Sequence, residues 1–203
     1  MNVGVFVSPE LSPVQGLVKP LSMPPELPLI HVDFEHGSDR AWWEELSGTW
    51  SVVDGLYDGL AVGAGGNSVF LSDRIRNFRL SFRCRVVSPQ PNRYLLSLLV
   101  RWRDSSNFYV VTMYTANDPT FPNSVRMYRV LAEVATDLGS ASASIATGSF
   151  YLLRVDALGS RFSVYLDGAF LFSVTDANIS SGRVGCRASS SRAQFDRFTV
   201  TRL

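Results

Sequence analysis

The sequence FYLLRVDALGSRFSVYLDGAFLFSVTD, residues 150–176, contains three short apolar runs separated by two turn signals. Within each run the apolar side chains occupy alternate positions, which places them on one face of a β-strand. Leu158-Gly159-Ser160 ends the first run and Asp167-Gly168 ends the second. Asp-Gly between two such runs is typical of a tight hairpin, because the turn needs positive φ angles. The stretch therefore predicts a three-stranded antiparallel meander.

The rest of the chain from residue 31 onward repeats this pattern on both sides of the meander. In Asn77–Val87, five apolar residues alternate with three arginines and a serine. Such a division into an apolar and a polar face suits an antiparallel sheet with one wet face. About a dozen such strands are expected, and two packed antiparallel sheets bury their apolar faces. We therefore predict an all-β, two-sheet antiparallel sandwich over residues 31–203.

Residues 1–30 differ in composition from this sandwich and form a separate segment. They contain six of the ten prolines of the chain, together with many Val and Leu residues. Proline interrupts strand pairing and favours an extended path, yet the segment is too apolar for an ordinary solvated linker. We predict an extended, Pro-rich arm that lies on its own sandwich or docks on a protein partner or on other copies of this chain.

Charge and hydropathy exclude several classes of partner. The formal net charge of +1 gives no electrostatic reason to expect nucleic acid. No stretch reaches the roughly 18 continuous apolar residues that a membrane span needs. No signal peptide is evident, because the N-terminus lacks a basic region and Pro9 and Pro13 interrupt its apolar run. The localisation is left open, and a virion or an extracellular particle is compatible with the arm.

The two cysteines, Cys84 and Cys186, occupy core-facing positions of predicted strands. Buried Cys packs as a small hydrophobe, so two free thiols are the favoured interpretation. A disulfide stays open as an alternative, provided that the two strands lie side by side.

Five motifs follow one another in an order that carries a resemblance. They are GTWSVVDGLY (48–57), FRLSFRCRV (78–86), SLLVRWRDSSNFYVVTM (97–113), the meander (150–176) and GRVGCRASSSRAQFDRFTV (182–200). This order resembles the concanavalin A-like lectin and glucanase superfamily, and in style its laminin G-like jelly-roll modules. The resemblance covers residues 32–200, although Asp196-Arg197-Phe198 replaces the usual Asp-Asn-Phe. It implies a jelly roll with ligands on its concave face or rim, but no single function.

A saccharide site needs aromatic rings that stack on sugars, with polar side chains beside them. Alternation places Trp102 in the core and Arg101 and Arg103 together on the opposite face, which the resemblance implies is the concave one. The alternative is that these aromatics fill the sandwich while the arginines solvate it. The candidate saccharide ligands are Arg101, Arg103, Asn107, Tyr109, Tyr114, Arg126 and Tyr128, with Phe121 and the Trp42-Trp43 pair as a supplement.

The resemblance also raises calcium and glycoside hydrolysis as possibilities. Calcium in relatives is held by oxygen ligands near strand ends, and Asp33, Glu35 and Asp196 would meet if the first and last strands pair. The alternative is that no cofactor is bound. Retaining glucanases need two carboxyls about 5 Å apart, and their ExDxxE spacing does not occur in this sequence. We therefore expect no catalytic residues and no enzyme activity.

The sequence thus predicts a non-catalytic structural or adhesion subunit with a lectin-like jelly roll. In this interpretation residues 1–30 dock it onto a larger assembly, such as a phage capsid or tail that it decorates, and the jelly roll binds glycans. The alternative is a stand-alone, secreted or cell-surface carbohydrate-binding module. A glycoside hydrolase of the same fold is the third hypothesis.

Overall fold

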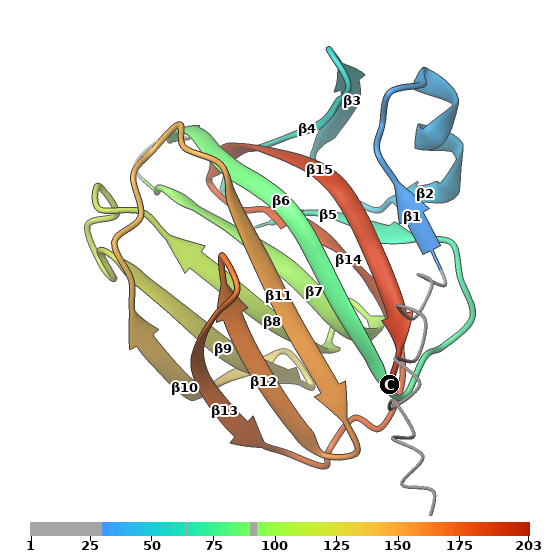
Figure 1. Ribbon diagram of the computed structural model, residues 1–203, viewed down its shortest axis with the longest axis vertical. Coiled ribbons are helices and arrows are strands. Elements are labelled where there is room, and N and C mark those ends of the chain that lie inside the picture. Colours follow the sequence, from blue (N-terminus) through green and yellow to red (C-terminus); the bar gives the residue numbers. More distant parts are fainter. Residues whose placement is uncertain (1–29, 64, 90–92) are drawn as a thin grey trace, which may run out of the picture.

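The computed structural model describes residues 30–63, 65–89 and 93–203, which form two antiparallel sheets packed face to face (Figure 1). Sheet A has the spatial order β13 (Ala169–Thr175), β12 (Arg161–Leu166), β11 (Tyr151–Leu158), β6 (Phe78–Pro89), β15 (Ser191–Arg202), β4 (Leu56–Ala61) and β3 (Thr49–Val53), and β1 (Ile30–Val32) also pairs with β15. Sheet B has the order β10 (Val134–Ser142), β9 (Ser124–Leu131), β8 (Asn107–Tyr114), β7 (Leu95–Asp104), β14 (Arg183–Ala188), β5 (Gly66–Phe70) and β2 (Trp43–Glu45). The predicted all-β sandwich is confirmed.

The predicted meander forms one side of sheet A as β11, β12 and β13. Its register places Val155 opposite Val164, so that the inward positions of the two strands coincide. The second turn contains Asp167 and Gly168 with φ angles of 48° and 82°, the left-handed values that the Asp-Gly signal indicates. All three strands and both turns are therefore as predicted.

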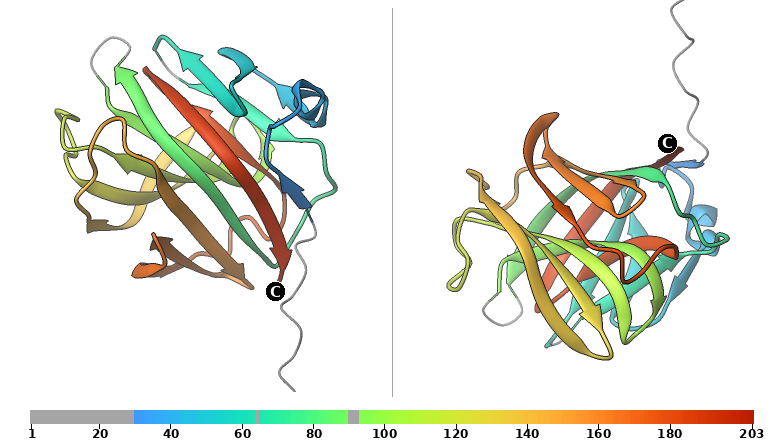
Figure 2. Two further views of the ribbon diagram at one scale, coloured as in Figure 1. Left: turned by 45° about the horizontal axis from the view of Figure 1, so that its top comes forward. Right: turned by 90° about the horizontal axis from the view of Figure 1, so that it is seen from below.

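The core lies between the two layers, which Figure 2 shows in edge view. Trp43 packs against several aromatic side chains of this core, and its ring lies 4.9 Å from that of Phe198 and 5.3 Å from that of Phe70. Cys84 and Cys186 are both fully buried and free, as the favoured interpretation expected. Burial raises the pKa of the Cys84 thiol to about 12, so it stays protonated and inert at neutral pH.

The first strand pairs with the last, since β1 lies antiparallel to β15 with Val32 opposite Phe198. β1 ends at Val32, and two residues later Phe34 has a φ of 60°, which a strand does not tolerate. The segment that follows forms a 3-10 helix, η1 (Gly37–Trp42), and then β2.

Residues 1–29, which hold almost all of the predicted arm, lie outside the described part of the chain. The prediction that this arm docks on a partner is therefore neither supported nor contradicted by the fold. Within the described ranges, no helix is long and apolar enough to cross a membrane.

Candidate functional site

A groove of about 290 Å³ lies on the outer face of sheet B. The residues that line it alternate along β7 and β8 with core residues such as Leu96 and Met113, so they point away from the core. Five neighbouring strands and the segments next to them contribute the lining. It consists of Arg93, Leu95, Ser97, Val110, Thr112, Tyr114, Tyr128, Val130, Ala135, Arg187 and Ser189.

A row of polar side chains crosses this face at right angles to the strands. Arg187 of β14 is paired in register with Ser97 of β7, Ser97 with Thr112 of β8, and Thr112 with Arg126 of β9. We call Arg187, Ser97, Thr112 and Arg126 the polar row. Neighbouring strands lie about 4.8 Å apart, so the row runs roughly 14 Å across the sheet. The Ser97 and Thr112 hydroxyls, 2.9 Å apart, are hydrogen-bonded to each other in its centre.

Apolar and aromatic side chains flank the polar row on both sides. Tyr114 lies on one side, in register with Leu95, and Tyr128 lies on the other, in register with Val110. The hydroxyls of the two tyrosines are 3.2 Å apart. Beyond Tyr128, a second hydrophobic cluster continues over the same face, formed by Val69, Leu99, Trp102, Phe108 and Val110. The groove thus combines hydroxyl and guanidinium groups with aromatic rings, the chemistry that a saccharide site requires.

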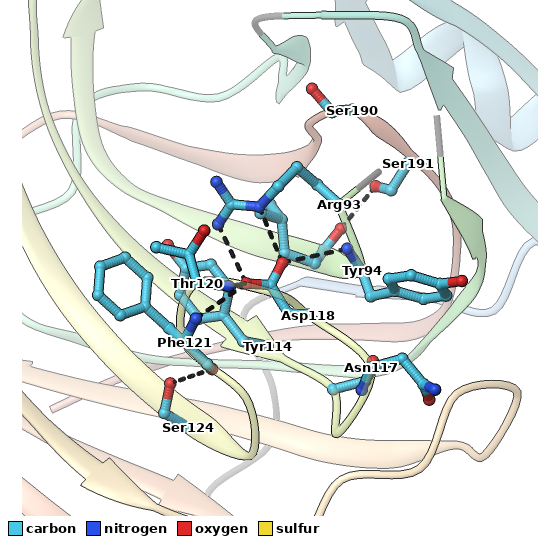
Figure 3. Close-up of polar contacts among 12 residues, drawn as sticks. Arg93, Tyr94, Tyr114, Asn117, Asp118, Thr120, Phe121, Ser124, Ser190 and Ser191 are labelled. Atoms are coloured by element: carbon cyan, nitrogen blue, oxygen red, sulfur yellow. Dashed lines mark hydrogen bonds and ion pairs between the residues drawn. The ribbon is translucent and has the colours of Figure 1, made fainter. Parts of the chain in front are cut away.

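One wall of the groove is fixed by an ion pair between Arg93 and Asp118 (Figure 3). Asp118 lies in the loop after β8, and its oxygens accept hydrogen bonds from Arg93 Nε at 2.9 Å and Nη2 at 3.3 Å. The same carboxylate accepts backbone N–H groups of Tyr94, Thr120 and Phe121 at 3.0–3.2 Å. Asp118 therefore ties its own loop to the segment before β7.

The environment of Asp118 favours its charged form. Burial alone would raise the pKa of this carboxyl, but the hydrogen bonds from Arg93 and the backbone N–H groups outweigh burial, so the pKa lies below its usual value. The Asp118 side chain is fully buried, whereas that of Arg93 is 31% exposed. The carboxylate is thus a structural anion, and the arginine keeps one side turned to the groove.

Phe121 lies next to this ion pair, because its backbone N–H donates to Asp118. Its ring lies 5.3 Å from that of Tyr114 in an edge-on contact, and the Arg126 guanidinium lies over it at 4.2 Å. Arg126 also forms an ion pair with Asp137 of β10. Arg126 is therefore held between an aromatic face and a carboxylate, as cation–π geometry favours.

The structure corrects the prediction for Arg101 and Trp102, which exchange faces. Arg101 has a φ of 51° in an irregularity of the β7–β8 register, and its side chain is fully buried. Its guanidinium donates to the carbonyl oxygens of Ile179, Arg76 and Gly159 at 2.7–2.9 Å. Trp102 then falls on the outer face, in the second cluster. A β-bulge inserts one residue and reverses the alternation beyond it, which explains the error.

Three other predicted ligands also lie outside the groove. Tyr109 is fully buried in the core, where its hydroxyl donates to Asp176 Oδ1 at 2.6 Å and burial raises its pKa to about 12. Asn107 caps the β7–β8 turn by donating to Asp104 Oδ1 at 2.8 Å. Arg103 is exposed near the same turn. Of the seven predicted ligands, Tyr114 and Tyr128 line the groove. Arg126 lies beside it, with its guanidinium 6.0 Å from the centre of the Tyr128 ring.

The residues proposed as calcium ligands do not converge. Asp196 accepts from Arg83 Nη1 at 2.8 Å, and Asp33 accepts from the backbone N–H of Glu35 at 3.2 Å. Across the described ranges, no three His, Cys, Asp or Glu side chains gather as a cation site. The first and last strands pair, which was the condition for this site, with Val32 opposite Phe198.

The sequence matches no protein-family model and no curated protein, whereas many solved structures share its fold. Carbohydrate binding module CBM66 from Bacillus subtilis matches with a TM-score of 0.70 and 20% identity, over 79% of this chain and 95% of that one. A Bacillus subtilis protein of unknown function with a galectin-like fold matches with a TM-score of 0.68 and 12% identity, over 89% and 98%. The exoplasmic/lumenal domain of VIP36, in a Ca²⁺/Man3GlcNAc-bound form, gives 0.65 and 14%, over 85% and 88%.

The chain has the concanavalin A-like jelly-roll fold. This confirms the fold that the resemblance of the five motifs implied. At identities of 12–20% the likeness concerns the fold alone, and the residues of the site have to be argued from their own geometry. Sequence reasoning missed Arg93, Asp118 and Arg187, because the partners that place them come from distant parts of the chain.

Proposed function

We propose that this protein is a carbohydrate-binding module and that the groove on sheet B holds the saccharide. The observation that carries the proposal is the polar row, which crosses the groove between Tyr114 and Tyr128. Sugars present apolar ring faces together with hydroxyl groups, so they need aromatic and hydrogen-bonding surfaces side by side. The fold adds support, since proteins that share it include a carbohydrate binding module and the exoplasmic/lumenal domain of VIP36 in a Ca²⁺/Man3GlcNAc-bound form.

In this site the tyrosine rings provide the apolar contact. Tyr128 is half-buried and reaches the groove from β9, while Tyr114 borders it from β8. Ser97 and Thr112 lie at the floor of the groove, with only 2% and 4% of their surface exposed. Their hydroxyls both donate and accept, and their mutual hydrogen bond can be exchanged for bonds to a sugar hydroxyl that reaches this floor. Arg93 and Arg187 supply further donors at the rim.

We propose that the groove binds the saccharide without hydrolysing it. Retaining hydrolysis needs two carboxyl groups about 5 Å apart on either side of the scissile bond. None of the described residues that line the groove is Asp or Glu. Asp118, which forms an ion pair with the lining residue Arg93, has a fully buried side chain.

The role as a docked subunit of a larger assembly stays a prediction of the sequence. It depends on residues 1–29, which the structure does not describe. A carbohydrate-binding module depends only on the described sandwich, so we place that alternative first.

The proposal is tested by affinity electrophoresis and calorimetry against a panel of neutral and acidic polysaccharides. We expect the wild-type protein to bind at least one of them and Y128A to weaken this binding about tenfold, or roughly 1.4 kcal/mol. Y165A is the matched control, because Tyr165 lies in β12 of sheet A, stacked under Arg154 at 3.6 Å. Absence of binding across the panel, or equal losses in Y128A and Y165A, would contradict the proposal.

A further inference from the structure

The arginines in and beside the groove differ in whether a carboxylate neutralises their charge. Arg93 is neutralised by Asp118 and Arg126 by Asp137. Arg187 has neither an ion pair nor a hydrogen-bond partner among the described residues, although it is half-buried. No Asp or Glu of the described chain lines the groove beside it. Arg187 is therefore the one cation of the polar row whose charge no described side chain balances.

The guanidinium of Arg187 is held in place by packing. A Cβ at Gly65 would lie 2.5 Å from Arg187 Nη2 and 2.8 Å from its Cζ, so the guanidinium rests directly on that glycine. Gly65 has a φ of 67°, a conformation that glycine adopts without strain. Burial lowers the pKa of Arg187, which reflects the cost of withdrawing an unbalanced charge from water.

We infer, on the basis of the proposed function, that the saccharide is anionic and that its carboxylate or sulfate group binds Arg187. A guanidinium offers a planar pair of donors that matches an oxyanion, and such charge-assisted pairs are among the strongest hydrogen bonds. The neighbouring Ser97 and Thr112 hydroxyls continue the polar row toward β9 and would receive the hydroxyls of the same sugar. A neutral sugar would leave the charge of Arg187 unbalanced.

Pairs of polysaccharides that share a sugar backbone but differ in charge test whether the charge of the ligand determines its affinity. Calorimetry compares dextran sulfate with dextran, and polygalacturonate with its fully methyl-esterified form, at low and at physiological salt. We expect the anionic member of at least one pair to bind tenfold or more tightly than its neutral partner, and this preference to shrink as salt rises. The pair that shows the preference distinguishes a sulfate from a carboxylate ligand.

Two variants of Arg187 test whether this residue causes the preference for the anionic polymer. R187Q should lower the affinity for the anionic polymer at least tenfold and leave that for the neutral polymer unchanged, whereas R187K, which keeps the charge, should lie between. R103Q removes an exposed arginine outside the groove and should bind like the wild type. Thermal melting of each variant confirms that it is folded.

The possible failures are distinguishable. Equal affinity of the wild type for charged and neutral polymers, or undiminished binding of the anionic polymer by folded R187Q, would overturn the inference and leave the proposed function standing. Absence of binding to every polysaccharide would overturn both.

Discussion

Asp118 joins the loop after β8 to the segment before β7, because its buried carboxylate accepts hydrogen bonds from both. D118N removes that charge and leaves Arg93 without its ion pair. We expect the free energy of unfolding to fall by about 2 kcal/mol at pH 7, measured by urea denaturation. D73N, which changes an exposed carboxylate, is the control and should cost less than about 0.5 kcal/mol. Equal effects would contradict the structural role of Asp118.

The same carboxylate makes the stability of the protein depend on pH. The pKa of Asp118 is lower in the folded protein than in the unfolded chain, so its charged form stabilises the fold. That contribution is fully present above the unfolded pKa of about 3.9 and is lost as the pH falls through the folded pKa. The difference in unfolding free energy between wild type and D118N should therefore be constant near neutral pH and shrink as the pH falls below about 4. A constant difference would exclude this linkage.

Arg101 stabilises the fold by binding three backbone carbonyl oxygens, and we expect no contact with ligand. R101M fills similar space but leaves those buried acceptors without donors, which should lower the unfolding free energy by about 3 kcal/mol. Saccharide affinity of the folded variant should be unchanged, as calorimetry below its melting temperature can show. Loss of affinity with unchanged stability would place Arg101 in the site after all.

Arg101 also shows why alternation in the sequence can assign a single side chain to the wrong face of a sheet. Alternation assigns a face to each side chain only while the pairing register is regular. The bulge at Arg101 changes the register by a backbone irregularity that no apolar pattern encodes, so Trp102 moves to the outer face. Tyr114 and Tyr128 lie in regular segments of β8 and β9, and their outward placement was predictable.

Among the strands, β14 depends on a glycine to lie between β5 and β7. A Cβ at Gly185 would lie 2.2 Å from the Ser68 carbonyl oxygen and 2.9 Å from Val69 Cα, both backbone atoms of β5. G185A must therefore push β5 and β14 apart, and we expect a loss of about 3 kcal/mol in unfolding free energy. G168A is unsuitable as a control because of its positive φ, whereas G37A meets no atom within 4 Å and should be nearly neutral.

If G185A were as stable as wild type, the close approach of β5 to β14 would be wrong. Because Arg187 lies two residues further along β14, the variant should also weaken saccharide binding. G37A changes the 3-10 helix, none of whose residues lines the groove, and should bind normally.

The elements differ in how much of them the sequence predicts. The β11–β13 meander was predictable because its turns and its alternation are local in sequence. The groove was not, because its floor depends on β14 inserting between β5 and β7. That arrangement brings Arg187 beside Ser97, 90 positions earlier in the chain, and no local pattern reports it.

For the whole molecule, we expect the groove to work without the arm, because every described residue that lines the groove lies between positions 93 and 189. A chain of residues 30–203 keeps all described strands, including β1. We expect it to bind saccharide within about twofold of the full chain, a difference of roughly 0.4 kcal/mol, by calorimetry. The carbohydrate-binding module also predicts that both chains are monomers in light scattering coupled to size-exclusion chromatography. A full chain that self-associates, beside a monomeric truncated chain, would instead favour the docked subunit that residues 1–30 suggest.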